Sequence, residues 1–202
     1  MRLQGIVSAA FLTSILIAGP YILAEEEKQA VNKAPDFTLT NYDGKTVKLS
    51  DLTGKIVVLE WFNYECPFVK YHYEKASTSQ NIAAKYKDKN VVWLAINSTK
   101  HLETQKNKEY AEKFKIDFPI LDDRTGTTGR AYGAERTPHI FIIDAKGNIA
   151  YRGAIDNAPL GKVADGEKVI NYAEKALDEL TEGKAVTTAE TKPYGCTVKY
   201  AK

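Results

Sequence analysis

An almost uninterrupted apolar run at residues 56–62, followed by Cys66 and Pro67, most constrains how this chain can fold. Apart from Glu60, the run does not alternate with polar residues, so it predicts a strand buried on both faces of a partly parallel sheet. Proline suits the first position of a helix, where its missing N–H is not needed. The segment therefore predicts a buried strand that leads into a helix beginning at Pro67.

Cys66 lies where this predicted strand passes into the predicted helix. At a helix N-terminus, backbone N–H groups and the helix dipole favour a thiolate over a thiol, so the position indicates thiol redox chemistry. The alternative is a structural role, because many free cysteines are simply small buried apolar residues.

Alternating and helical patterns predict the remaining elements. The expected strands are residues 34–39 and 46–49, which form a hairpin, then 91–96, and a second hairpin of 140–143 and 148–151. The expected helices are residues 67–86, 103–114, a short segment ending near 132–133, and 167–181. This order indicates an α/β fold with a mixed central sheet flanked by helices.

Two of these helices carry apolar residues at helical spacing. The candidate buried positions are Phe68, Tyr71, Ala76, Ile82, Ala83 and Tyr86 in the first, and Val169, Ile170, Ala173, Ala176, Leu177 and Leu180 in the last.

The N-terminal segment, residues 1–24, predicts a secretory signal peptide. Arg2 precedes an apolar stretch, and cleavage is expected after Ala24. An uncleaved membrane anchor is the alternative, since the segment is just long enough to span a bilayer. The rest divides into a polar leader (25–33), one domain (34–182) and a tail without clear period (183–202), and the expected location is periplasmic or secreted.

Charge and cysteine content narrow the function further. The chain has 28 basic and 26 acidic residues in scattered positions, which gives no indication of a nucleic-acid partner. In an oxidising compartment Cys66 has one possible cysteine partner, Cys196, 130 positions later. Such a bridge would stabilise the fold by about 5 kcal/mol, so a purely structural disulfide is a further alternative.

Several short segments between residues 34 and 200 form a specific family signature through their order and spacing. Each segment alone is weak evidence for a family. They are Ala34-Pro35-Asp36-Phe37 with Asp43-Gly44-Lys45; the motif Cys66-Pro67-Phe68-Val69-Lys70; Ala95-Ile96-Asn97-Ser98; Thr137-Pro138; Gly147-Asn148-Ile149 with Tyr151-Arg152-Gly153; and Gly195-Cys196. On these segments the chain resembles the thioredoxin-like superfamily, within it the redoxins of the AhpC/TSA (peroxiredoxin-like) and TlpA-like kind. The resemblance implies a thioredoxin-like fold.

The resemblance assigns Cys66 the role of the nucleophile that attacks a disulfide. The family's second cysteine position holds Val69, which cannot resolve a mixed disulfide, and another cysteine position of the subgroup holds Arg136. Either Cys196 or an external small thiol would then resolve the intermediate.

The resemblance also implies roles for four further residues of the site. Pro138 matches a cis-proline, and Thr137 before it would present its backbone to an extended substrate; Pro67 joins them in the expected substrate-binding set. Glu60 matches a buried acid that takes or gives a proton during exchange. Glu60 pointing to solvent, or pairing with a lysine, is the alternative.

A thiol-dependent peroxidase, a peroxiredoxin-like antioxidant, is one competing function. Peroxidases of this fold carry a threonine three residues before the cysteine and a proline seven before it, and these positions hold Asn63 and Leu59. Thr137-Pro138 occupies the strand where their arginine is expected. Without these groups, nothing identified orients peroxide or stabilises its leaving oxygen.

A copper-binding or non-catalytic thioredoxin-fold module is the second alternative. Copper-delivery relatives pair two cysteines four positions apart with a histidine, and the second position here is Lys70. His139 could lie near Cys66, whereas His72 and His101 are expected to be surface imidazoles.

The sequence therefore predicts a thioredoxin-like α/β fold with an N-terminal β-hairpin extension. The predicted function is that of a thiol-disulfide oxidoreductase of the cell envelope, in which Cys66, Glu60 and Cys196 are catalytic. Its partners would be protein or small-molecule thiols and disulfides, without nucleic acid, cofactor or metal, and with a membrane only if the N-terminal segment stays attached.

Overall fold

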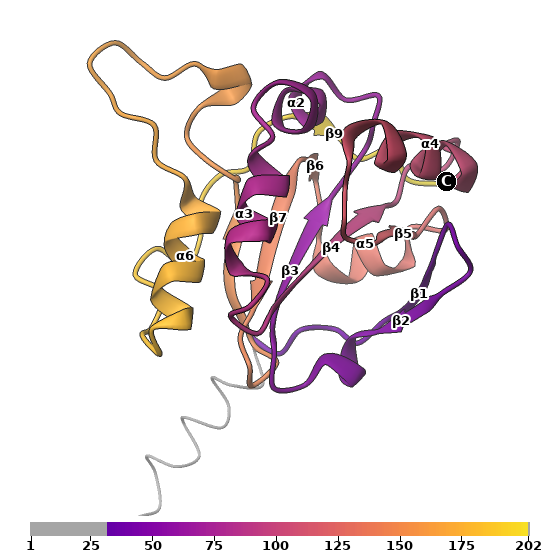
Figure 1. The fold of residues 1–202 in the computed structure, drawn as a ribbon, viewed down its shortest axis with the longest axis horizontal. Coiled ribbons are helices and arrows are strands. Elements are labelled where there is room, and N and C mark those ends of the chain that lie inside the picture. Colours follow the sequence, from indigo (N-terminus) through magenta and orange to yellow (C-terminus); the bar gives the residue numbers. More distant parts are fainter. Residues whose placement is uncertain (1–31, 202) are drawn as a thin grey trace, which may run out of the picture. The chain divides into compact units, whose positions relative to one another are not determined.

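The computed structural model describes residues 32–201, so the predicted signal peptide and most of the polar leader lie outside the described residues. Within this range, seven strands form one sheet in the order β2-β1-β5-β4-β3-β7-β8 (Figure 1). The strands are β1 (Thr38–Asn41), β2 (Thr46–Lys48), β3 (Ile56–Trp61), β4 (Val91–Asn97), β5 (Ile120–Asp122), β7 (His139–Ile143) and β8 (Ile149–Gly153). A separate two-stranded sheet pairs β6 (Arg136–Thr137) with β9 (Cys196–Thr197).

The large sheet is mixed, as predicted. Strand β3 runs parallel to β4 and antiparallel to β7, and β4 runs parallel to β5. All six residues of β3 are buried, which explains its continuous apolar sequence. Both predicted hairpins are confirmed, and β1 of the first one pairs with β5, so this hairpin extends the sheet.

Helices and helical turns cover both faces of the sheet. They are α2 (Pro67–Lys70), α3 (Thr78–Tyr86), α4 (Thr104–Phe114), α5 (Thr127–Tyr132) and α6 (Tyr172–Thr181), with 3-10 turns η1 (Leu49–Leu52) and η3 (Pro159–Gly161) and a π-helical turn η2 (Tyr71–Lys75). Residues of α3, α4 and α6 pack with one face of β3, represented by Val58. Tyr132 of α5 and Leu49 of η1 pack with the opposite face, represented by Leu59.

The single helix predicted over residues 67–86 is wrong. The π-helical turn η2 follows α2, and Ser77 then adopts a left-handed conformation (φ 50°) that separates η2 from α3. A π turn contains one residue more than an α turn and so shifts the buried face. As a result Tyr73 is buried in the core, while Phe68 and Tyr71, predicted to be buried, are only partly covered.

The start predicted for the last helix is also wrong. Helix α6 begins after Asn171, whose side chain accepts a hydrogen bond from the Glu174 N–H at 2.9 Å. This N-cap provides an acceptor for a backbone N–H of the first turn, which has no partner within the helix. The predicted core residues Val169 and Ile170 precede the cap and are 61% and 45% exposed.

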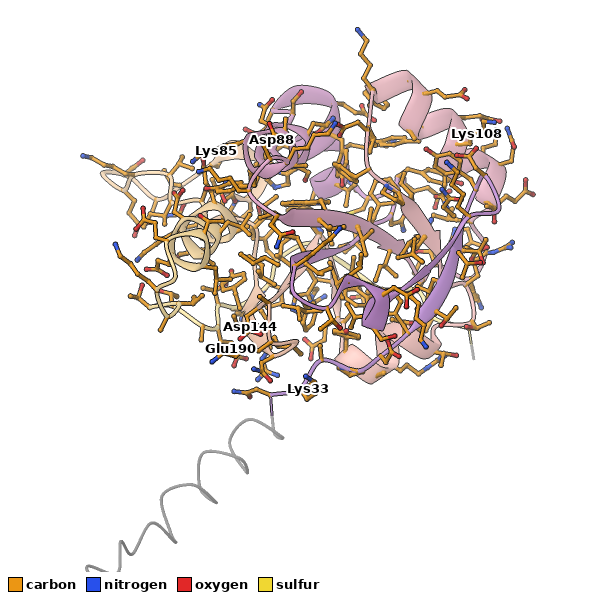
Figure 2. The ribbon with its side chains drawn as sticks, turned by 60° about the horizontal axis from the view of Figure 1, so that its bottom comes forward. Lys33, Lys85, Asp88, Lys108, Asp144 and Glu190 are labelled. Carbon is orange, nitrogen blue, oxygen red and sulfur yellow. The ribbon has the colours of Figure 1, made fainter. Side chains whose placement is uncertain are left out.

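The short strands β5 and β9 have no counterpart in the sequence prediction, because two or three residues are too few to show a period. Charged side chains such as Lys33 and Lys108 lie at the periphery (Figure 2). None of the helices between residues 32 and 201 has the length and apolar character needed to cross a membrane.

Candidate active site

Cys66 lies at the N-cap of α2, directly before Pro67, as predicted. Its N–H donates to the carbonyl of Asn63 at 3.0 Å, and its carbonyl accepts from the Lys70 N–H at 2.9 Å. Pro67 occupies the first helical turn and is exposed. The turn after β3 therefore fixes the Cys66 backbone through hydrogen bonds on both sides.

The sulfur of Cys66 points toward β6. Its thiol donates to the carbonyl oxygen of Thr137 at 3.0 Å, and the peptide between Thr137 and Pro138 is cis, as predicted. The side chain of Cys66 is nearly buried, with 2% of the residue exposed. The structure thus brings together three of the residues that the sequence singled out, from two distant segments.

Cys196 lies beside them, on β9. It is the antiparallel partner of Thr137 in the β6–β9 sheet, and the Cys66 thiol donates to the carbonyl oxygen of this same Thr137 at 3.0 Å. Both cysteines are in the free thiol form. The two cysteines are thus neighbours in the folded chain, although 130 positions separate them in sequence.

These contacts separate the acidities of the two thiols. Burial opposes ionisation of Cys66, but the neighbouring side chains of Cys196 and Thr137 and the backbone N–H groups of Val69 and Cys196 outweigh it, and the pKa of Cys66 is lowered. Burial and the neighbouring Cys66 raise the pKa of Cys196 to about 11. Cys66 is therefore the more readily ionised thiol of the pair, and Cys196 the less readily ionised one.

Gly195 allows the chain before Cys196 to approach β6 closely. A Cβ atom at this position (φ 115°) would lie 2.2 Å from the carbonyl oxygen of Thr137. The same carbonyl accepts the hydrogen bond from Cys66. Glycine is thus required here for contact rather than for flexibility.

Glu60 is fully buried in β3 and does not reach solvent or a lysine, the two alternatives raised by the sequence. Its carboxylate accepts hydrogen bonds from Tyr73 (2.7 Å), Ser79 (3.2 Å) and Trp93 (3.1 Å). Burial nevertheless raises the pKa of Glu60 to about 7. Tyr73 and Trp93, which donate to Glu60, belong to the same core cluster as Cys66, and the structure shows no hydrogen bond between Glu60 and Cys66.

The histidines differ from the sequence expectations. His139 packs on Phe141 with ring centroids 4.5 Å apart, and burial lowers its pKa to about 4. Phe141 belongs to the core cluster on the face of the sheet opposite to that of Cys66, so His139 does not face the thiol. His72, expected at the surface, is completely buried. His101 is exposed, as expected, and lies 3.0 Å from Glu65.

Both peroxidase-diagnostic positions have structural roles here. The Asn63 side chain accepts a hydrogen bond from the Glu65 N–H at 2.8 Å and so shapes the turn before Cys66. Leu59 is fully buried in β3.

Three contributors to the site, Tyr73, Trp93 and Tyr194, are absent from the sequence prediction. Tyr73 and Trp93 donate to Glu60, but the register that brings them there depends on the π turn and on the parallel pairing of β3 with β4. Tyr194 contacts His72, and the sequence signal for it is its position directly before Gly195-Cys196.

Comparison with known proteins agrees with this geometry. The AhpC/TSA family matches residues 30–152. Thiol-disulfide oxidoreductase ResA of Geobacillus kaustophilus (strain HTA426) is 32% identical over 151 residues, 71% of this chain and 83% of that protein. A crystal structure of an uncharacterized conserved protein from Geobacillus kaustophilus superposes with a TM-score of 0.74 at 32% identity, covering 84% of this chain and 90% of that one. A putative thiol:disulfide interchange protein DsbE from Chlorobium tepidum gives a TM-score of 0.57 at 26% identity, covering 75% and 94%.

Proposed function

Because the chain belongs to the AhpC/TSA family and is a thiol-disulfide oxidoreductase with a thioredoxin-like fold, we propose that it works through Cys66, with Cys196 as its resolving thiol. The observation that carries the proposal is that both cysteines meet at Thr137: Cys66 donates to its carbonyl oxygen at 3.0 Å, and Cys196 pairs with it in the β6–β9 sheet. In this arrangement the pKa of Cys66 is lowered and that of Cys196 is raised. A thiolate beside a protonated thiol is the arrangement that a two-step disulfide exchange requires.

The proposed reaction has two exchanges. In the first, the Cys66 thiolate attacks one sulfur of a substrate disulfide, forms a mixed disulfide and releases one substrate thiolate. In the second, Cys196 loses its proton and attacks the sulfur of Cys66, which forms the Cys66–Cys196 disulfide and releases the other substrate thiolate. The substrate gains two electrons and two protons, and the protein becomes oxidised. The reverse sequence oxidises a dithiol.

Thr137, Pro138 and Pro67 are proposed to bind the substrate. The carbonyl of Thr137 accepts a hydrogen bond from the Cys66 thiol, and Pro67 follows Cys66 directly in the sequence and is exposed. Substrates of the proposed class are protein thiols and disulfides or small thiols, in keeping with the name of the ResA relative.

Glu60 is proposed to carry the proton during exchange. A pKa of about 7 allows the carboxyl group to accept or release a proton at neutral pH. Glu60→Gln is expected to slow the reduction of a substrate disulfide at neutral pH while the fold is retained. An exchange rate equal to that of the unmodified protein would assign Glu60 a structural role only.

Mixed-disulfide trapping tests the assignment of the two cysteines. Cys196→Ser is expected to accumulate a mixed disulfide on Cys66, and Cys66→Ser is the control that should accumulate none at that position. Redox titration of the unmodified protein with mass-spectrometric thiol mapping should detect a Cys66–Cys196 peptide. Absence of this peptide under every oxidant would refute the intramolecular mechanism.

The proposal places the protein in the periplasm or outside the cell. The support is the apolar segment that ends at Ala24. N-terminal sequencing of the protein from its native source should begin at Glu25. A retained segment in the membrane fraction would indicate the anchored alternative.

A further inference from the structure

The segment that carries Cys196 is attached to the domain on both sides of this residue. We call residues 189–201 the strap. Before Cys196, the Thr191 N–H donates to the carbonyl of Arg152 at 3.1 Å. After it, Val198 is buried in the core and the Tyr200 hydroxyl donates to the carbonyl of Ala134 at 2.7 Å.

Tyr194 provides a further attachment close to Cys196. Its hydroxyl donates to Asp156 Oδ1 at 2.5 Å and contacts His72 Nε2 at 2.8 Å. Because the hydroxyl proton goes to Asp156, His72 must donate through Nε2, and its Nδ1 then accepts from the hydroxyl of Thr78 at 3.1 Å. Each polar atom of this chain of contacts thus has a partner.

The partners of Tyr194 belong to the segment that holds Cys66. His72 lies in η2, which continues directly from α2, and it is completely buried. The ring of Tyr194 also packs against Phe68 of α2, with centroids 5.8 Å apart. Tyr194 therefore ties the strap to the same helical segment whose first turn begins at Cys66.

The closed strap covers the nucleophile. Gly195 lies against the carbonyl of Thr137, and β9 pairs with β6, the short strand beside it in Figure 1. With the strap in this position only 2% of Cys66 is exposed. An extended substrate that pairs with Thr137 and reaches the Cys66 sulfur must therefore displace the strap.

We propose that Tyr194 is a positioning residue that latches the strap, limiting the access of substrates to Cys66 and returning Cys196 to the mixed disulfide. The proposal rests on the proposed roles of Cys66 and Cys196. Attack on a substrate requires the open strap, whereas resolution requires the closed strap. Loss of the latch must therefore change the two steps in opposite directions.

Tyr194→Phe removes the hydroxyl and keeps the ring that packs on Phe68. A hydrogen bond to a charged group contributes enough that its loss is expected to change the ratio of open to closed strap roughly tenfold. Ellman's reagent separates the two steps, because attack by Cys66 releases one coloured thiolate and resolution by Cys196 releases a second. The first phase should accelerate by up to about tenfold, because the strap of the free protein is closed, and the second phase should slow.

Tyr86→Phe is the matched control. Its hydroxyl donates to Asp178 at 2.6 Å, between α3 and α6 and away from the strap. This variant removes the same kind of hydrogen bond, so it reproduces a general loss of stability. Because Tyr86 does not hold the strap, neither phase of the Ellman reaction should change. A merely structural Tyr194 would behave in the same way as Tyr86.

The outcomes distinguish the latch from the function on which it rests. If the unmodified protein shows no second phase, the proposed resolving role of Cys196 is wrong. If it shows both phases and Tyr194→Phe matches Tyr86→Phe, only the latch is wrong. Should Tyr194→Phe not fold, Asp156→Asn weakens the same bond by removing its charge, and unchanged phases in that variant would overturn the latch.

Discussion

The charge on Cys66 depends on a residue 130 positions away. Position at a helix start predicted a thiolate, and the pKa of Cys66 is indeed lowered. The cause, however, includes the Cys196 thiol and its backbone N–H as well as the N–H of Val69 in the first turn of α2. The local sequence therefore predicted that the pKa of Cys66 is lowered. Part of the cause of this shift comes from the fold, which brings Cys196 to Cys66.

Two substitutions of Cys196 measure this contribution. Serine keeps a hydroxyl donor near Cys66, and alanine removes it. We expect the pKa of Cys66 to be lower in Cys196→Ser than in Cys196→Ala, because only the serine can donate to the thiolate. The measurement is the pH dependence of Cys66 alkylation. Identical profiles for the two variants would show that the side chain at position 196 does not influence Cys66.

Glu60 shows what a single residue can reveal in advance. A lone acid in an apolar strand was recognisable as unusual, because an unpaired buried carboxylate is unfavourable. The residues that donate hydrogen bonds to Glu60 could not be identified from the sequence. Tyr73 comes from the π turn, and Trp93 comes from β4, so their positions relative to Glu60 follow from helix irregularity and strand register.

Glu60 should make stability depend on pH. Its pKa is raised by burial from 4.5 to about 7, so the folded state binds more protons than the unfolded state between these values. The stabilisation is complete below pH 4.5 and is lost as the pH rises through 7. Between about pH 4.5 and 8 the free energy of unfolding should fall by about 3 kcal/mol more in the unmodified protein than in Glu60→Gln.

Urea denaturation at several pH values measures this difference. Glu74→Gln, at an exposed position, provides the matched control and should follow the unmodified protein. A parallel pH dependence in Glu60→Gln and the unmodified protein would mean that Glu60 does not titrate in this range.

Among the secondary-structure elements, those with a long apolar or alternating pattern were predicted correctly. Features that depend on one or two residues were not. The buried strand β3 and both hairpins were predicted from apolar runs and turn residues. The break at Ser77 was not, because a single left-handed residue leaves no periodic signal. The strap was also missed, since it forms only two residues of strand and depends on pairing with β6.

Gly195 provides a test of the contact between β9 and β6. In Gly195→Ala the new Cβ would lie 2.2 Å from the Thr137 carbonyl oxygen, so the two strands must separate. We expect Cys66 alkylation in a Cys196→Ser background to accelerate by about tenfold or more and the free energy of unfolding to fall by about 2 kcal/mol. Gly183→Ala is the control, because Gly183 also has a positive φ (73°) but nothing within 4 Å of the added Cβ.

Gly183→Ala should cost about 1 kcal/mol from its backbone conformation and leave the alkylation rate unchanged. If Gly195→Ala leaves Cys66 as protected as this control does, the strap does not limit access to the thiol.

For the whole molecule, the fold joins two segments that sequence comparison treats separately. The AhpC/TSA match ends at residue 152, before the strap and Cys196. Cys66, the proposed nucleophile, lies within the matched range, and its proposed resolving partner Cys196 lies outside it. Val69 in the usual second-cysteine position indicated that either Cys196 or an external small thiol resolves the intermediate, and the β6–β9 pairing brings Cys196 next to Thr137.

Oxidation should therefore change the stability of the entire domain. A Cys66–Cys196 bond closes a loop of 130 positions and should raise the free energy of unfolding by about 5 kcal/mol through the entropy of the unfolded chain. Denaturation of the oxidised and reduced forms measures the difference. Cys196→Ala is the control, in which oxidant should have no effect.

The pH dependence of this difference links stability to the thiolate. The pKa of Cys66 is lowered in the folded reduced protein, so ionisation stabilises that form as the pH rises from the folded pKa toward the ordinary thiol value of 9.0. The oxidised form has no such group. The advantage of the oxidised over the reduced protein should consequently be larger at pH 5 than at pH 8, which lies below the range in which the raised pKa of Cys196, about 11, acts in the opposite sense. A constant difference would show that the folded protein does not favour the Cys66 thiolate.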